Sequence, residues 1–199
     1  MSISIDACVA QHQGDRKEQQ DRVSLVPHPR GGGVALAVVA DGMGGHTGGV
    51  LAAQQVIHTA SSNLGQFSAR SESARSMLEA SLNEAHLLIK ASRFINEKDP
   101  HSTAVMLLLQ PGKVSWAHCG DSRLYRFRGD RLMFRTTDHS YVEQLVAKRK
   151  ITPVEAAARK GSASPARPNI IRCASVLPRL AAGCSKPDRP ISTVPARSE

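Results

Sequence analysis

Apolar and polar positions along the chain form patterns that predict two long helices and several strands. The apolar run at residues 34–40 is continuous and has the length of a strand, which favours a strand buried on both faces. Apolar positions recur at helical spacing over residues 50–64 and, more clearly, over residues 73–96. Shorter apolar or alternating runs predict further strands at residues 3–9, 23–26, 102–109, 113–119, 122–128 and 131–135.

Turn residues divide these runs and indicate how they connect. Proline and three glycines at residues 29–33 predict a turn before the buried strand. Gly129-Asp130 between the last two strands is a strong hairpin signal, and a last helix is expected to start over residues 141–147. Because the strands lie before and after a pair of helices and do not alternate with them, the order predicts a layered α+β domain.

Composition divides the chain near residue 150. The 199 residues carry a formal net charge of +9, with 41% apolar residues, enough for a hydrophobic core. Residues 1–150 hold 18 basic against 14 acidic residues, whereas residues 151–199 hold 8 against 3, together with seven of the eleven prolines and none of the aromatic residues. Composition therefore predicts a folded domain followed by a basic, proline- and arginine-rich tail.

Several classes of protein are excluded by the same sequence. No run of 18 apolar residues predicts a transmembrane helix, and the first residues lack the basic and apolar regions of a signal peptide. The four cysteines include no C-x-x-C pair, so a zinc ribbon or dithiol motif is not supported. A reduced, cytoplasmic protein is the expectation.

Asp41 is the strongest single candidate for chemistry, because it ends the buried run and opens into five glycines within eight residues. A buried carboxylate is costly unless it is hydrogen-bonded or holds a cation, and glycines let backbone groups approach a ligand closely. An equally weighted interpretation is that Asp41 caps a helix beginning near Gly48. The spacing excludes the dinucleotide-binding glycine pattern and the Walker loop.

Three further residues are candidates on weaker grounds. Asp121 follows an apolar run, where a turn aspartate that bonds neighbouring amides is the favoured interpretation. Asp21 lies in a polar loop and would ordinarily be solvated. Arg16 lies in the same loop, and arginine suits two-pronged recognition of a phosphate.

The remaining polar residues of interest favour structural interpretations. The segment Asp138-His139-Ser140 is interpreted as a helix N-cap with no catalytic role. His46, His101 and His118 are isolated in the sequence and are expected to be surface or structural groups.

Taken in order, these segments resemble a known family. Arg16 and Asp21 are followed by the sequences DGMGGH at 41–46, STAV at 102–105, GDSRLY at 120–125 and TDHS at 137–140. This order and spacing is similar to that of the bacterial metal-dependent serine/threonine protein phosphatases of type 2C, over about residues 5–157. Each motif is weak alone, but five in the same order are highly specific.

The resemblance implies an α+β fold, a four-layer α-β-β-α sandwich of two antiparallel sheets flanked by helices. It implies hydrolysis of phosphoserine and phosphothreonine in proteins by a water that two Mn²⁺ or Mg²⁺ ions activate, without a covalent intermediate. The partners that it implies are phosphorylated proteins and a cognate bacterial Ser/Thr kinase in signal transduction, with no membrane and no nucleic acid.

Individual roles follow from the resemblance position by position. Asp41 matches the aspartate that bridges both ions, and the carbonyl of Gly42 matches an adjacent ligand. Arg16 matches the phosphate-binding arginine. Asp21 matches an acid that orders the metal site, and Asp121 matches a position linked to a third, looser ion. Oxygen ligands of this kind suit Mg²⁺ and Mn²⁺.

The sequence departs from the family pattern at two places. Gln20 stands where a metal-binding glutamate often stands, as it does in some bacterial members. The Ser-Asp-Gly and Asp-Asn segments that supply later carboxylates do not occur after residue 140. Our hypothesis is a frameshift or truncation near residues 157–173. It would leave a partial phosphatase-like domain over residues 1–157, incomplete at its C-terminus, and a disordered, basic, proline- and arginine-rich tail over residues 158–199. We expect weak metal binding and little or no activity.

Two other functions compete with this interpretation. One is a non-catalytic phosphatase-like module that binds phosphoprotein through Arg16 or regulates a partner. The other is an anion- or nucleic-acid-binding protein that acts through the basic tail, which the lack of aromatic residues there disfavours.

Overall fold

A computed structural model describes residues 6–44, 46–92, 99–140, 143, 145–146, 148–152 and 154–156. The larger sheet is antiparallel, with the strand order β1 (Asp21–Pro27), β2 (Ala35–Met43), β4 (Ala104–Gln110) and β5 (Lys113–Cys119). The two-residue strand β3 (His101–Ser102) pairs with the end of β2. A separate two-stranded sheet is formed by β6 (Tyr125–Arg128) and β7 (Arg131–Arg135).

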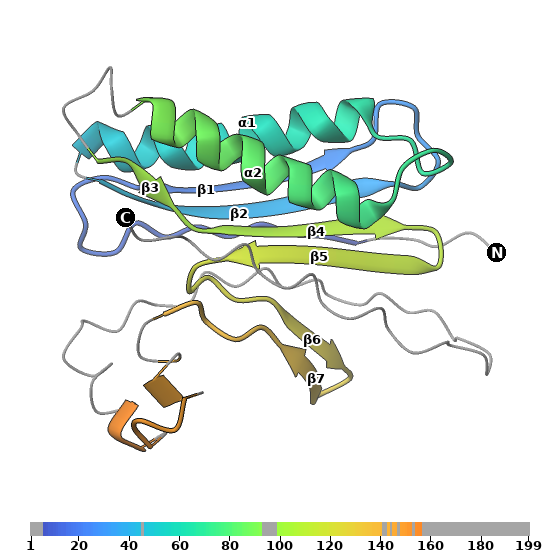
Figure 1. Ribbon diagram of the computed structural model, residues 1–199. Helices are drawn as coiled ribbons and strands as arrows, with labels where there is room; N and C mark the ends of the chain where they lie inside the picture. Colours follow the sequence, from blue (N-terminus) through green and yellow to red (C-terminus); the bar gives the residue numbers. More distant parts are fainter. Residues whose placement is uncertain are drawn as a thin grey trace.

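Both long helices cover one face of the larger sheet (Figure 1). Helix α1 (His46–Gln66) and helix α2 (Ala74–Ser92) pack on each other and on the strands. The hairpin β6–β7 lies on the other side of the sheet from these helices (Figure 1). The prediction of an α+β fold with two antiparallel sheets and helices is confirmed, and the hairpin forms the second sheet.

Strand β2 is buried on both faces, as its continuous apolar run predicts. Leu36, Val38 and Ala40 belong to the core beneath the helices, whereas Ala37 and Val39 face a second core. This second core is closed by Leu124 and by the ring of Phe134, whose centroid lies 5.0 Å from that of Trp116. The second core therefore attaches the hairpin to the larger sheet.

Most boundaries predicted from the sequence are confirmed within a few residues. The turn at residues 29–33 is present, with glycines in the left-handed region at 31, 32 and 33. Strands 113–119 and 131–135 were predicted to the residue. The second helix ends at Ser92, and residues 93–96 lie outside the described residues. Within 141–147, the described residues 143, 145 and 146 are helical.

Two strand predictions were wrong in part. Residues 6–9 form no strand, because no other described segment pairs with their backbone, and Val9 is 55% exposed. Residues 3–5 of that prediction lie outside the described residues. Residues 122–124 also stay outside the sheets: the Leu124 amide donates to the Thr136 hydroxyl, at 3.0 Å, in place of a ladder partner.

The tail assigned to residues 158–199 lies outside the described residues. Among the helices that the structure describes, none is long and apolar enough to cross a membrane.

Candidate functional site

Four residues singled out from separate motifs gather at one end of the larger sheet. Asp21 is the first residue of β1, and the antiparallel register pairs it with Asp41 near the end of β2. Arg16 lies in the loop that leads into β1, and Asp121 comes two residues after β5. This is the end of the sheet at which α1 begins, on the left of Figure 1.

Asp41 lies in the electrostatic field of the other three. The pKa of its carboxyl is raised from an ordinary value of 3.8 to about 6, chiefly because burial removes water from the charged form. A hydrogen bond with Asp21 and the negative charges of Asp21 and Asp121 raise it further, whereas the charge of Arg16 acts in the opposite direction. Asp41 thus belongs to strand β2 and to a cluster of acids, and the interpretation of it as a helix cap is wrong, because α1 begins five residues later at His46.

The carboxylate pair leaves a buried acceptor without a partner. Asp21 is 7% exposed, and its Oδ1 atom has no hydrogen-bond partner among the described residues. Two carboxylates in contact are stable only if they share a proton or neutralise a cation. The donor set therefore fits a hard divalent cation such as Mn²⁺ or Mg²⁺.

The Asp21 and Asp41 carboxylates provide few ligands for two metal ions. Within the described ranges, no group of three or more His, Cys, Asp or Glu side chains lies close enough together to hold a metal ion. The carbonyl of Gly42, beside Asp41, is a further possible oxygen ligand at this end of the sheet. The arrangement suits one cation at the Asp21–Asp41 pair better than a full two-metal centre.

Glycines allow the backbones of strand β2 and helix α1 to pack closely at this end of the sheet. Gly42 and Gly49 are both buried, and a Cβ atom on Gly42 would collide with the backbone carbonyl of Gly49. A Cβ atom on Gly49 would in turn collide with the side-chain oxygen of Gln20. The neutral amide that replaces the family's glutamate is therefore packed against the start of α1, beside the acids.

Thr103 is a site residue that the sequence analysis did not single out. Its amide donates to the Asp41 carbonyl at 2.9 Å, and its hydroxyl accepts from the Asp41 amide at 3.0 Å. The same hydroxyl is 2.7 Å from that of Ser122, the residue after Asp121. Gly120 (φ +98°) packs so closely that its Cβ would lie 2.7 Å from Thr103 Cγ2. A polar residue directly before an apolar strand was the available signal.

The helix N-cap predicted for Asp138-His139-Ser140 is confirmed at Ser140, and Asp138 itself pairs with Arg123. Asp138 is 8% exposed, and both carboxylate oxygens accept hydrogen bonds from the guanidinium of Arg123, each at 2.6 Å. The pair also raises the pKa of Arg123, which stays charged. The capping contact is made by Ser140, whose hydroxyl accepts from the Glu143 amide at 3.2 Å. Asp138 therefore joins the GDSRLY and TDHS segments.

His118 has the structural surroundings predicted for it. Its ring stacks on that of His139, with centroids 4.3 Å apart, and its Nε2 is 3.0 Å from the Thr137 carbonyl. His139 Nδ1 accepts from the Gly120 amide at 3.3 Å. Burial, and then the neighbouring His118, lower the pKa of His139, so the neutral ring is favoured.

The other two histidines lie outside the acid cluster. His101 is exposed and contacts Asp99, and the side chain of His46 lies outside the described residues.

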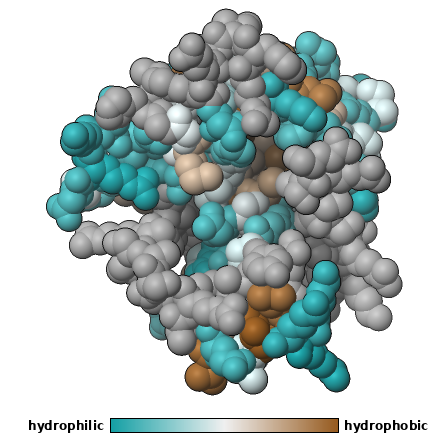
Figure 2. All heavy atoms as spheres, turned by 60° about the vertical axis from the view of Figure 1, so that its left-hand side comes forward, coloured by the Kyte–Doolittle hydropathy of each residue, from teal (hydrophilic) through white to brown (hydrophobic). Residues whose placement is uncertain are grey.

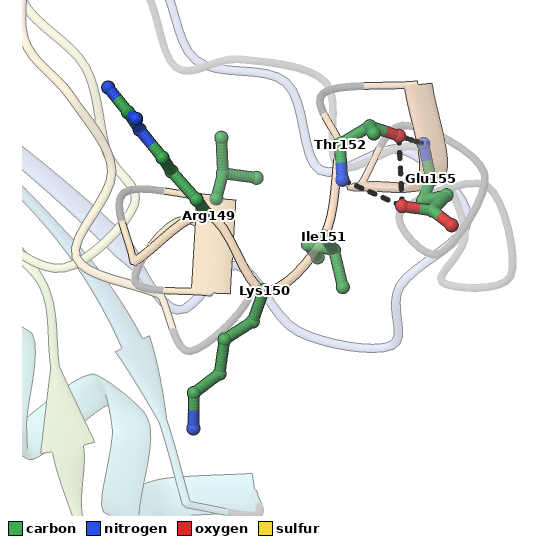
Figure 3. Close-up of a pocket in the computed structure, with 6 residues that line it drawn as sticks. Arg149, Lys150, Ile151, Thr152 and Glu155 are labelled. Atoms are coloured by element: carbon green, nitrogen blue, oxygen red, sulfur yellow. Dashed lines mark hydrogen bonds between the residues drawn. The ribbon is translucent and has the colours of Figure 1, made fainter.

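A shallow depression near the end of the described chain does not form part of the site. It is lined by six residues, and Figure 3 shows Thr152 and Glu155 bonded to each other across the start of a helical turn. The side chains of Arg149 and Lys150 point in different directions (Figure 3). Figure 2 brings forward the side of the molecule at which α1 begins, and both hydrophilic and hydrophobic side chains are visible at its centre.

Comparisons with known proteins identify the family of this chain. The family description "Protein phosphatase 2C" matches residues 10–158. A putative 2C-type phosphatase of Streptococcus pyogenes is 27% identical over 185 residues, covering 85% of this chain and 72% of the relative. The phosphatase PstP of Mycobacterium tuberculosis is 33% identical over 129 residues, covering 62% of this chain but 24% of PstP.

Solved structures share the fold. A bacterial serine phosphatase superposes with a TM-score of 0.69 at 26% identity, covering 84% of this chain and 66% of that one. The PstP catalytic domain in complex with two manganese ions gives a TM-score of 0.58 at 27% identity, covering 78% and 62%. The chain thus spans about two thirds of the solved phosphatase structures. With the family match over most of its length, the chain belongs to the protein phosphatase 2C family.

Proposed function

We propose that this chain is a metal-dependent serine/threonine protein phosphatase domain, with activity impaired relative to a complete family member. The observation that carries the proposal is the gathering of Arg16, Asp21, Asp41 and Asp121 at one end of the larger sheet, where the charges of the other three residues shift the pKa of Asp41. Phosphorylated serine and threonine side chains of proteins are the substrates, and a bacterial Ser/Thr kinase is the enzyme that would produce them.

Each residue has a distinct part in the proposed reaction. Arg16 is exposed beside the acids, so its guanidinium can accept an incoming phosphate and orient it. Asp41, Asp21 and the carbonyl of Gly42 would hold the cation, and Asp121 offers a third, more exposed carboxylate. Bound Mn²⁺ or Mg²⁺ would supply a water of lowered pKa and neutralise charge on the phosphate. Thr103 keeps Asp41 and the Asp121 segment in register.

Impairment follows from the number of carboxylates. Two dications need several anionic oxygens, and the described residues provide one close carboxylate pair with no third carboxylate, histidine or cysteine in reach. The acids of the missing downstream motifs would supply the rest. We therefore infer loose metal binding and slow turnover, and we propose that the phosphatase-like part of the chain covers residues 1–157, with the basic segment 158–199 outside it.

Hydrolysis of p-nitrophenyl phosphate and of a phosphothreonine peptide, with Mn²⁺ titrated in, tests the proposal. We expect turnover well below that of PstP's catalytic domain, abolished in Asp41→Ala and retained in Asp130→Ala, a turn aspartate remote from the site. Activity that is independent of Mn²⁺, or unchanged in Asp41→Ala, would contradict the proposed chemistry. Turnover equal to PstP's would contradict the impairment.

The lack of a third carboxylate, histidine or cysteine beside this pair, within the described ranges, also favours a second candidate, a non-catalytic module that binds phosphoprotein through Arg16. Calorimetric titration distinguishes the two. Saturable Mn²⁺ binding that is lost in Asp41→Ala supports the enzyme, whereas phosphopeptide binding without Mn²⁺, lost in Arg16→Ala, supports the module. A cytoplasmic location remains a prediction from the sequence.

A further inference from the structure

The hairpin β6–β7 carries an unusual concentration of exposed positive charge. Four exposed arginines occur within the eleven residues of the hairpin, against a single acid, Asp130 in the turn. No hydrogen bond or ion pair to another described residue involves their side chains. These four residues, which we call the arginine hairpin, are Arg126, Arg128, Arg131 and Arg135.

Arg123, just before the hairpin, has a structural role and serves as a comparison for the hairpin arginines. Its guanidinium makes two 2.6 Å hydrogen bonds to the buried carboxylate of Asp138. The Arg123–Asp138 ion pair therefore fixes the segment before the hairpin, whereas the four arginines of the hairpin form no ion pair with a described residue. Stability of the fold does not account for them.

The hairpin register places two of these arginines against each other. Arg128 and Arg131 are direct cross-strand partners. Like charges at directly opposite positions destabilise an antiparallel pair. An anion that bridges the two guanidiniums would remove this repulsion.

Apolar side chains accompany the charge. Phe127 and Leu132 are the next cross-strand pair and are 55% and 49% exposed, and the ring of Phe127 stacks on that of Tyr125 at 6.3 Å. Arginine and aromatic side chains are the types enriched in protein–protein interfaces. This mixture favours a polypeptide partner over a purely electrostatic one.

The arginine hairpin is connected to the acid cluster by a short, fixed segment. Tyr125 follows Asp121 by four residues, a span of about 14 Å at most. Ser122 in this segment is bonded to Thr103, which is bonded to Asp41. An extended peptide advances about 3.3 Å per residue. A peptide with its phosphate at Arg16 could therefore reach the arginine hairpin within about eight residues.

We propose that the arginine hairpin is a docking surface for acidic segments of the phosphoprotein, within about eight residues of the phosphorylated side chain. This inference rests on the proposed function, because it names the substrate class of the same site. Charge complementarity carries it: four unpaired guanidiniums fit aspartate, glutamate or a second phosphorylated residue. The contacts are exposed, so binding falls as ionic strength rises.

Binding of fluorescent twelve-residue phosphothreonine peptides, followed by anisotropy at about 50 mM NaCl, tests the proposal. One peptide carries four glutamates after the phosphothreonine and the other carries glutamines. We compare the double variant Arg126→Glu/Arg131→Glu with a matched control, Arg30→Glu/Arg70→Glu, which changes the net charge equally at exposed arginines outside the hairpin. We expect the acidic peptide to lose about tenfold in affinity, ~1.4 kcal/mol, in the hairpin variant only. The glutamine peptide should bind all three proteins equally.

The neutral pair Arg126→Gln/Arg131→Gln guards against misfolding of the charge-reversed hairpin, and a smaller loss in the same direction is expected from it. Equal losses in hairpin and control variants, or equal binding of the two peptides, would overturn the proposal. So would tighter, hairpin-dependent binding of a single-stranded oligonucleotide of equal charge, which would identify a nucleic-acid surface. An unphosphorylated acidic peptide separates the two proposals: if it binds as well as its phosphorylated form and remains hairpin-dependent, docking stands and phosphate recognition at Arg16 fails.

Discussion

Replacing Asp41 with asparagine is expected to stabilise the metal-free protein at neutral pH while removing its response to metal. In the folded chain the pKa of Asp41 is about 6, against 3.8 for an ordinary aspartate. A carboxyl with a raised pKa favours the folded state most when protonated, below about pH 4. That contribution is lost as the pH rises through 6, because the folded state must then hold a charge that burial and Asp21 disfavour.

The magnitude follows from the two pKa values. The gap between 3.8 and about 6 corresponds to roughly 3 kcal/mol at about 1.36 kcal/mol per pH unit. Because Asp41 is only partly buried and is coupled to Asp21, screening by solvent reduces this to about 1–2 kcal/mol. Asparagine is neutral at every pH and can donate to the Asp21 carboxylate, so Asp41→Asn should retain that free energy at pH 7.5.

Urea unfolding followed by circular dichroism, at pH 4.5 and pH 7.5 with EDTA or with millimolar Mn²⁺, measures the effect. We expect Asp41→Asn to be more stable than the wild type at pH 7.5 in EDTA, with the difference shrinking at pH 4.5. Mn²⁺ should stabilise the wild type and leave the variant unchanged. Asp130→Asn, in the exposed turn, should behave as the wild type. An Asp41→Asn protein that is less stable at pH 7.5 without metal would refute the reasoning.

Three further substitutions test the contacts around the site. Thr103→Val leaves the Asp41 amide without its acceptor and should lower the free energy of unfolding by about 1–3 kcal/mol in urea titrations, with Thr103→Ser closer to wild type. An unchanged unfolding midpoint would argue against a stabilising role of the Thr103 hydroxyl. Asp138→Asn leaves Arg123 with a neutral partner and should cost about 2 kcal/mol, less than a fully buried pair because Arg123 is 27% exposed; a loss equal to that of Asp130→Asn would show the pair to be dispensable. Gly49→Ala places a methyl group against backbone and should cost about 1–3 kcal/mol, seen as a lower thermal midpoint, whereas Gly65→Ala, in the same helix with open space, should not.

Local patterns were sufficient to locate most of the secondary structure. The continuous apolar run predicted a strand buried on both faces because burial on both faces requires apolar residues at every position. The Gly129-Asp130 turn predicted the hairpin because the turn geometry needs a residue that tolerates positive φ, and Gly129 has φ +56°. The predicted strand at residues 6–9 was wrong, because a strand also needs a neighbour and the sequence of the segment does not reveal whether one is present.

The candidate acids could be named from the sequence, but their surroundings could not. Asp138 has the sequence context of a helix cap, and only the fold brings Arg123 within 2.6 Å of it. Thr103 lies in the STAV segment, which the sequence analysis quoted without assigning a role to this residue, and its role follows from lying between Asp41 and Ser122 in space. Contacts between residues far apart along the chain depend on strand register, which no local pattern encodes.

The sequence by itself determined the family, the order of the elements and the identity of the acids and of Arg16, since these depend on residue types and spacings. The tertiary structure decided what these residues can do together. Burial and strand pairing set the electrostatics of Asp41 and leave an Asp21 oxygen without a partner, because desolvation and charge–charge interactions depend on distances in space. The tertiary structure also decided which arginines form ion pairs. Arg123 pairs with Asp138, whereas the side chains of the arginine hairpin are exposed to solvent.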